Sequence, residues 1–215
     1  MLNILFTNPV LFLVWACALL VAITIHEYAH AWAADRLGDP TPRLQGRLTL
    51  NPLAHLDPIG TIMLLLVKIG WGKPVQFDPY NLQNPKRDTA LISLAGPFSN
   101  LALATLLSLV LRLVSSPFSA LHFLSFLIPP FIFLNLVLAI FNLIPIHPLD
   151  GGKILIGLLP HKDAYQVDRF LNQYGMLILL FLLLPVWNGS SPILFIITPI
   201  INFLLSILIP GSPII

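Results

Sequence analysis

The residues most able to perform chemistry in this chain are His26-Glu27-Tyr28-Ala29-His30. On a helix, positions i and i+4 share one face, so the imidazoles of His26 and His30 can bind one cation together. Glu27 follows the first imidazole directly, where its carboxylate can take a proton from a water molecule that the cation activates. The pattern therefore predicts a hydrolytic metal site with Glu27 as the general base.

The setting of this pattern gives it weight. It ends an apolar run, residues 10–25, within a helix that we expect to begin at Asn8-Pro9 and to end near Leu37, before Gly38-Asp39-Pro40. In a soluble protein such a short match is often accidental. Ionisable side chains inside a membrane helix are costly and usually have a function, so here a metal site is the favoured reading.

The composition indicates a membrane protein. Of the 215 residues, 57% are hydrophobic and only 9% are charged, against about 25% charged in soluble domains. We expect an all-α polytopic membrane protein with about five to six transmembrane helices, in which residues 1–215 form a single domain. The net charge of +2 gives no reason to expect nucleic acid, and the single cysteine, Cys17, permits no internal disulfide. The first apolar segment carries the motif, so we expect it to remain in the mature protein.

The region between the first two spans is less regular. Residues 59–69 are apolar but only about half a span long, which favours a re-entrant or interfacial segment. Residues 44–50 show a partial strand-like alternation and could pair with the extended stretch 71–79, as in a β-hairpin. Since irregular backbone at membrane depth must be satisfied by protein or water, we expect this region to line the active-site cavity.

The remaining chain contains further apolar segments, and its basic residues predict an orientation. Spans are expected at 89–114 and 120–144, and the last two apolar segments, 176–187 and 193–209, follow a charged stretch at 161–173. Seven of the eleven Lys and Arg residues lie between positions 36 and 87, and three more lie between 153 and 169. The positive-inside rule places both groups in the cytoplasm, and residue 150 then lies on the same side as His30.

A catalytic zinc usually has three protein ligands and one open position. Asp150 is the best third ligand, because it follows the end of a span and Gly151-Gly152 lets the backbone turn tightly beside it. The alternative is that Asp150 only caps the following helix. Asp57 is the second candidate ligand, although it too has the sequence context of a cap.

Together with the first motif, several others resemble the site-2 protease family of intramembrane zinc metalloproteases, and most closely its compact bacterial and archaeal branch. The likeness covers residues 1–155, whereas the C-terminal helices in 156–215 match only in character. The further motifs are Gly46-Arg-Leu-Thr-Leu-Asn-Pro-Leu-Ala-His-Leu-Asp-Pro-Ile-Gly60, Gly70-Trp-Gly-Lys-Pro-Val75, Asn84-Pro-Lys-Arg-Asp88, Ala95-Gly-Pro-Phe-Ser-Asn100 and Asn142-Leu-Ile-Pro-x-x-Pro-Leu-Asp-Gly-Gly152.

The resemblance implies one Zn²⁺ per chain, held by His26, His30 and Asp150, with Glu27 as general base and Asn142 near the bound substrate strand. It also implies a multi-pass protein of the cell membrane, with its active site toward the cytoplasmic side and single-span membrane proteins as substrates. Other branches carry a PDZ or cystathionine-synthase-like domain, and this chain shows neither.

Two further histidines have open roles. His147 stands where such family members usually have proline. It could approach the metal or hydrogen-bond Asp150, or it could be an ordinary histidine at the membrane edge. His55 could stabilise the oxyanion or hydrogen-bond a ligand, or it could only satisfy loop carbonyls. Asn100 and Asn135 are expected to join helices through hydrogen bonds.

The sequence thus predicts a zinc endopeptidase that cuts a transmembrane segment of another protein near the cytoplasmic face. The substrate helix must unwind, and its strand could add to the edge formed by the 44–50 and 71–79 region. A metal-ion transporter or channel could use the same His/Glu/Asp cluster as a transit site, although the ionisable groups gather toward one face. A scaffold that binds membrane proteins without cutting them is a further alternative, and the intact Glu27 argues against it.

Overall fold

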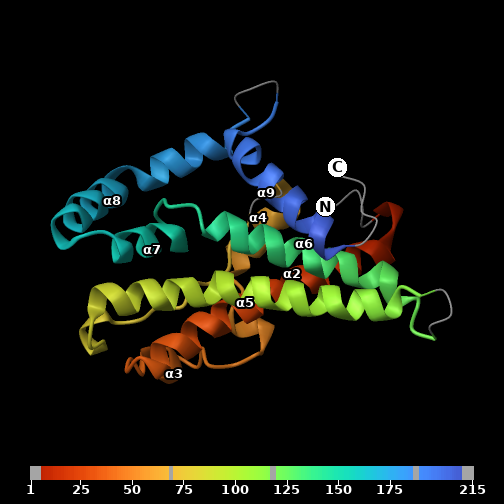
Figure 1. Cartoon of the computed structure of the whole chain (residues 1–215), viewed down its shortest axis with the longest axis horizontal. Coiled ribbons are helices and arrows are strands. Elements are labelled where there is room, and N and C mark those ends of the chain that lie inside the picture. Colours follow the sequence, from red (N-terminus) through yellow and green to blue (C-terminus); the bar gives the residue numbers. More distant parts are fainter. Residues whose placement is uncertain (1–5, 68–69, 117–119, 186–188, 210–215) are drawn as a thin grey trace.

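The computed structural model describes residues 6–67, 70–116, 120–185 and 189–209, and its regular structure in these ranges is helical (Figure 1). The helices are α2 (Pro9–Arg36), α3 (Thr41–Leu44), η1 (Pro52–Ala54), α4 (Pro58–Val67), η2 (Pro79–Asn81), α5 (Pro85–Val114), α6 (Leu124–Asn142), α7 (Asp150–Leu158), α8 (His161–Leu183) and α9 (Pro192–Leu208).

Among the described residues, α2, α5 and α6 are long and apolar enough to cross a membrane. Helix α9 is apolar but has only 17 residues, and α8 begins with a charged stretch. The all-α membrane architecture is therefore confirmed, whereas the expected five to six spans are not.

Local sequence accounts for the bounds of α2. The Asn8 side chain accepts a hydrogen bond from the Leu11 amide at 3.0 Å, and Pro9 occupies the first turn, where it needs no hydrogen-bonding partner. At the other end Gly38 adopts a positive φ of 111°, which other residues rarely tolerate. Both bounds lie within one residue of the expected ones.

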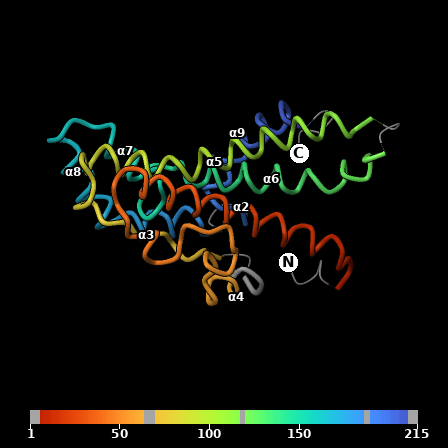
Figure 2. Tube along the Cα trace, turned by 90° about the horizontal axis from the view of Figure 1, so that it is seen from below, coloured from red at the N-terminus to blue at the C-terminus, as the bar shows by residue number. Residues whose placement is uncertain are grey.

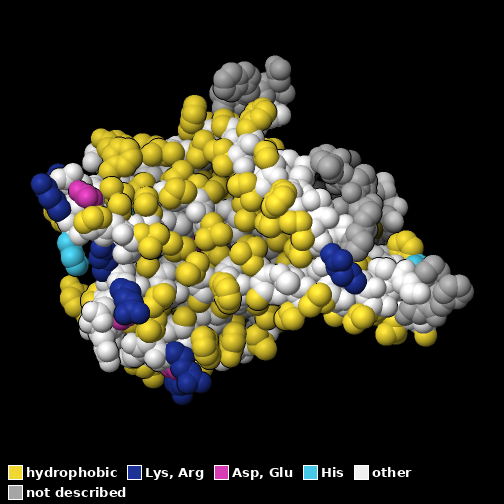
Figure 3. Space-filling model, in the orientation of Figure 1, with side chains coloured by type: hydrophobic (Ala, Val, Ile, Leu, Met, Phe, Trp, Pro, Cys, Tyr) yellow, Lys and Arg dark blue, Asp and Glu magenta, His cyan; other side chains and the backbone are white. Residues whose placement is uncertain are grey.

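Helices α5 and α6 run side by side along the length of the molecule, with α2 against them and α9 across α6 (Figures 1 and 2). Their contact surface forms the main apolar core, around the fully buried Ala104, Ile132 and Leu136. Small buried residues, Ala18 and Ala22, allow α2 to approach closely, as is common where membrane helices pack. Large apolar side chains cover the outside, and Lys and Arg gather mainly at the end of the molecule where α5 and α8 begin (Figure 3).

The predicted hairpin between 44–50 and 71–79 is not confirmed, because the described residues form no strand. Leu44 ends α3 and the chain turns at Gly46, whose φ is +69°. An isolated antiparallel bridge joins Leu56 to Gly72 instead. The two loops are held together largely by the buried Arg47 guanidinium, which donates hydrogen bonds to the carbonyls of residues 54, 73 and 74.

Two other expectations can be compared with the helices. Helix α4 is only ten residues long, too short to cross a bilayer, which agrees with the half-span reading of 59–69; residues 68–69 lie outside the described part. The charged stretch 161–173 is continuous with the apolar segment that follows it, because the two together form α8. Its Ala164 and Leu171 are buried, in line with Leu179 further along α8, so one continuous face packs on the molecule.

Candidate metal centre

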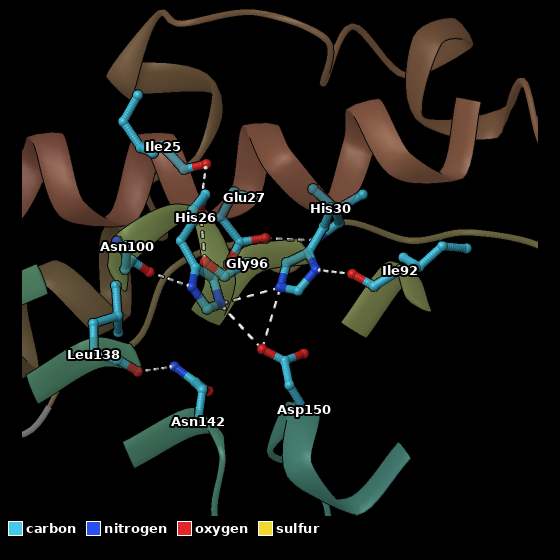
Figure 4. A network of polar contacts seen from close by, with 12 residues as sticks. Ile25, His26, Glu27, His30, Ile92, Gly96, Asn100, Leu138, Asn142 and Asp150 are labelled. Carbon is cyan, nitrogen blue, oxygen red and sulfur yellow. Dashed lines mark hydrogen bonds and ion pairs between the residues drawn. The ribbon is translucent and has the colours of Figure 1, made fainter. Parts of the chain in front are cut away.

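Helices α2 and α7 bring three potential ligands to one point. His26 and His30 lie one turn apart on α2, and Asp150 is the first residue of α7 (Figure 4). The Asp150 Oδ2 atom lies 3.1 Å from His26 Nε2 and 3.2 Å from His30 Nε2, and the two Nε2 atoms are 3.1 Å apart. All three side chains are largely buried, and they are the one cluster of potential metal ligands found among the described residues.

The opposite ring nitrogens determine which atoms are free to bind a cation. His30 Nδ1 lies 2.7 Å from the Ile92 carbonyl, and His26 Nδ1 lies 2.7 Å from Asn100 Oδ1. Both oxygens only accept, so each Nδ1 must be the donor. In a neutral imidazole the Nε2 atom then carries a lone pair and no proton.

A chain of amides fixes the orientation of Asn100. Its Nδ2 donates to the Ala22 carbonyl at 3.0 Å and to Asn135 Oδ1 at 2.7 Å, while Asn135 Nδ2 donates to the Phe131 carbonyl at 2.8 Å. Backbone carbonyls require N–H groups, so neither amide can be reversed. Both asparagines are fully buried. The expected helix-joining role is present, and the same bonds orient His26, as partners of metal-binding histidines do.

The donor set fits a zinc ion. Two unprotonated imidazole nitrogens and a carboxylate oxygen converge. When both rings are neutral, no hydrogen bond can form between the two nitrogens, so a cation is the partner that suits them. Burial raises the pKa of the Asp150 carboxyl, but positive charge at the two imidazoles, which protonated rings supply, outweighs burial and holds that pKa well below its ordinary value. A cation bound between the rings would act on the carboxyl in the same direction. Two nitrogens and one ionised oxygen make up a common zinc ligand set that leaves a fourth position open.

Gly96 lets α5 approach both rings. A Cβ atom at this position would lie 2.4 Å from His30 Nε2 and 2.7 Å from His26 Cε1, closer than van der Waals contact permits. Pro97 follows within the same helix. A glycine inside a membrane span is the sequence signal that could have identified this close approach.

Glu27 faces a different part of the molecule. Its Oε2 atom accepts a hydrogen bond from the Val75 amide at 3.0 Å, in the extended segment that follows Gly72. Its Oε1 atom would lie 3.8 Å from a Cβ added at Gly72. A carboxylate beside a metal site, oriented by one backbone N–H and with its second oxygen free of that bond, can exchange a proton with water.

The other candidates lie as follows. Asp57 Oδ1 accepts from the Gly60 amide at 2.7 Å, so it caps α4 and is not part of the cluster. His55 is fully buried and its Nε2 donates to the Thr49 carbonyl at 2.8 Å, which is the loop-satisfying role. The partner of His147 is Asp168 on α8, whose Oδ1 lies 3.4 Å from His147 Nε2, and not Asp150. Asn142, at the end of α6, donates to the Leu138 carbonyl at 3.0 Å.

Comparisons with known proteins identify relatives that are named as zinc metalloproteases. The model of peptidase family M50 matches residues 115–184. YwhC of Bacillus subtilis, named as a zinc metalloprotease, is 40% identical over 169 residues, which are 76% of this chain and 77% of that protein. Rip2 of Mycobacterium tuberculosis, named in the same way, is 36% identical over 182 residues, covering 79% of this chain and 66% of Rip2. Zinc metalloprotease MJ0392 of Methanocaldococcus jannaschii is 26% identical over 74% of this chain and 38% of its own length. No solved structure matches this chain.

The fold and the ligand cluster together define a membrane metalloprotease that uses zinc. The chain belongs to peptidase family M50, the site-2 protease family. This membership supports a metalloprotease over the transporter and the non-cutting scaffold.

Proposed function

We propose that this protein cleaves transmembrane segments of single-span membrane proteins near the cytoplasmic face. The observation that carries the proposal is the convergence of three ligand atoms where α7 meets the membrane helix α2, with Glu27 on the same turn of α2 as His26. Zinc at this point would supply Lewis acidity, polarising a carbonyl and making nearby water more acidic. His26, His30 and Asp150 are the proposed ligands, and all other steps fall to the surrounding side chains.

Glu27 is the proposed general base. Its Oε2 is oriented by the Val75 amide, while Oε1 can take a proton from the attacking water and pass it to the leaving amine. Asn142 is proposed to touch the substrate strand, since its Nδ2 donates to Leu138 and its Oδ1 accepts no hydrogen bond from the described residues. Helical peptide bonds are shielded, so the substrate must be unwound where it is cut.

Orientation follows from the charge distribution. Lys and Arg gather mainly at the end of the molecule that carries the starts of α5 and α8 (Figure 3), and the positive-inside rule assigns this end to the cytoplasm. Cysteines placed at Arg43 and Lys162 in a Cys17→Ser background should both be labelled from the cytoplasmic side. Labelling from opposite faces would contradict the proposed orientation.

The central test is Glu27→Gln, which keeps the volume and removes the base. Zinc content should stay at the wild-type value while cleavage of a membrane-embedded substrate falls by about 10²–10⁴-fold. Substrate should still bind and accumulate uncut. The control is Gln45→Glu, at an exposed position after α3 and outside the metal centre, which should leave cleavage intact. Wild-type cleavage by the Glu27→Gln protein would refute the assignment, and absence of cleavage by the wild type with every substrate would refute the function.

A further inference from the structure

A groove of about 800 Å³ lies beside the metal centre and takes no part in binding the metal. Its walls come from the extended segment 74–77, the start of α5, and helices α7 and α8. His26, His30 and Asp150 do not line it. The side chains that decide its chemistry are Phe77, Lys86, His147, Lys153 and Asp168.

The groove adjoins both halves of the active site. Val75 lines it and also donates the amide hydrogen bond that holds Glu27, at 3.0 Å. Lys153 lines it from α7, three residues after Asp150, so the two lie on the same side of that helix. A chain bound in the groove would therefore be continuous with a peptide bond placed at the metal centre.

The groove offers positive charge to its occupant. The Lys153 ammonium lies 5.0 Å from the centroid of the Phe77 ring, and the Lys86 ammonium donates a hydrogen bond to the Leu159 carbonyl. Neither lysine forms an ion pair with a carboxylate of the described residues. The one acidic group in the lining, Asp168, is already in contact with His147 Nε2 at 3.4 Å.

We propose that this groove binds an acidic, extended stretch of the substrate that directly adjoins the cytoplasmic end of the cleaved transmembrane segment. The inference rests on the proposed function and names the substrate class for it. Most single-span proteins carry Lys and Arg on the cytoplasmic side of the membrane. Two lysines held in the groove would repel such a flank and attract Asp and Glu, so the groove would select a minority of membrane proteins by charge.

A peptide fits these observations better than an anionic lipid headgroup. Lys153 is only partly exposed and its ammonium sits over an aromatic ring inside the groove, whereas lysines that recruit lipid extend toward the membrane surface. The segment that holds Glu27 also borders the groove. A substrate must pass this segment to reach the metal centre, whereas a lipid need not.

The experiment uses the full chain, loaded with zinc, in vesicles of neutral phosphatidylcholine. Three versions of one single-span substrate differ only in the residues that adjoin the cytoplasmic end of the span, which are acidic, neutral or basic. We expect kcat/KM for the acidic version to exceed that for the neutral version by about fivefold, as for one or two partly exposed ion pairs, with the basic version lowest. Lys153→Glu should reverse the order and Lys153→Gln should reduce the preference, each with wild-type zinc content. Lys162→Glu, at an exposed position of α8 outside the groove, should leave the order unchanged.

The outcomes separate this inference from the proposed function. Equal cleavage of all three versions by a zinc-loaded wild type would overturn the proposed role of the groove, while the proposed protease function would stand. A charge preference that appears only when anionic lipid is added, and that ignores the substrate, would assign the groove to lipid and also overturn the proposal. Cleavage of none of the versions would refute both. Reversal of the order by Lys153→Glu alone would support the peptide groove.

Discussion

His26 and Glu27 are neighbours in the chain but belong to two differently built regions. His26 enters a buried region between helices, where side-chain amides of α5 and α6 and the Gly96 backbone surround it (Figure 4). Glu27, about 100° further around α2, meets an extended loop and is held by a single backbone amide. The metal is thus placed by rigid helices and the base by a loop. We expect changes in the first region to alter zinc content, and changes in the second to alter cleavage with zinc in place.

The largest effect is expected for Asp150→Ala on the helical side. Removing the one ionised oxygen of the cluster leaves two imidazoles, so purified protein should lose most of its zinc and activity should fall by at least about 10³-fold. Asp163→Ala, at an exposed position of α8, is the control and should keep both. Undiminished zinc in Asp150→Ala would show that Asp150 is not a ligand.

A methyl group added at Gly96 tests whether backbone approach positions the rings. In Gly96→Ala the new Cβ would overlap both imidazoles, and we expect roughly a hundredfold weaker zinc binding in a competition assay with a chelator. Ala102→Val adds volume to an exposed face of the same helix and should leave the affinity unchanged. Wild-type zinc affinity in Gly96→Ala would mean that the rings can shift at no cost.

Asn100→Leu removes the acceptor that fixes the His26 tautomer. Loss of such a partner typically weakens metal binding by 10–100-fold, and we expect about tenfold here, with a smaller effect for Asn135→Leu one bond further away. The order of the two losses in zinc affinity separates an effect on the orientation of the His26 ring from an effect on helix packing. If Asn135→Leu costs more than Asn100→Leu, the amides act mainly by joining helices.

The smallest effect on cleavage is expected in the loop region beside Glu27, where the stability of the loop depends on pH. Asp39 is fully buried and accepts hydrogen bonds from Thr41, Asn81 and the Asp78 amide, which ties η2 to the end of α2. Burial raises the pKa of this carboxyl, but the hydrogen bonds outweigh burial and lower it. A lowered folded-state pKa stabilises the loop at pH values above the ordinary carboxyl range, and this stabilisation is lost as pH falls through the lowered value.

Hydrogen exchange of residues 73–81 measures this directly. Protection in the wild type should be constant from about pH 8 to pH 5 and should decrease below about pH 4, near the ordinary carboxyl pKa. Asp39→Asn should exchange faster throughout and lose that pH dependence, while zinc content stays unchanged and cleavage falls by only a few fold. Loss of zinc in Asp39→Asn would show that the two regions are not independent.

The fold was predictable where local rules act alone. Asn8-Pro9 and Gly38 bound α2, and the bounds of α5 and α6 lie within a few residues of the expected spans. The hairpin is not confirmed, because a partial alternation at 44–50 does not reveal that the Arg47 side chain binds the carbonyls of residues 73 and 74. It also does not reveal that backbone pairing occurs instead between Leu56 and Gly72. Composition did not show that the charged stretch 161–173 and the apolar segment after it form one continuous helix, α8.

By itself the sequence determined the chemical types of the site. The i, i+4 spacing places His26 and His30 on one face of any helix, and the apolar run makes that helix a membrane span. Only the tertiary structure decided which nitrogen of each ring faces the metal, because Ile92 and Asn100 lie more than sixty residues away and act through contacts that no local rule contains. The contact between Glu27 and the Val75 amide was likewise decided by the tertiary structure, because it joins residues far apart in the chain. The groove with its two lysines also exists only where helices from distant parts of the chain pack together.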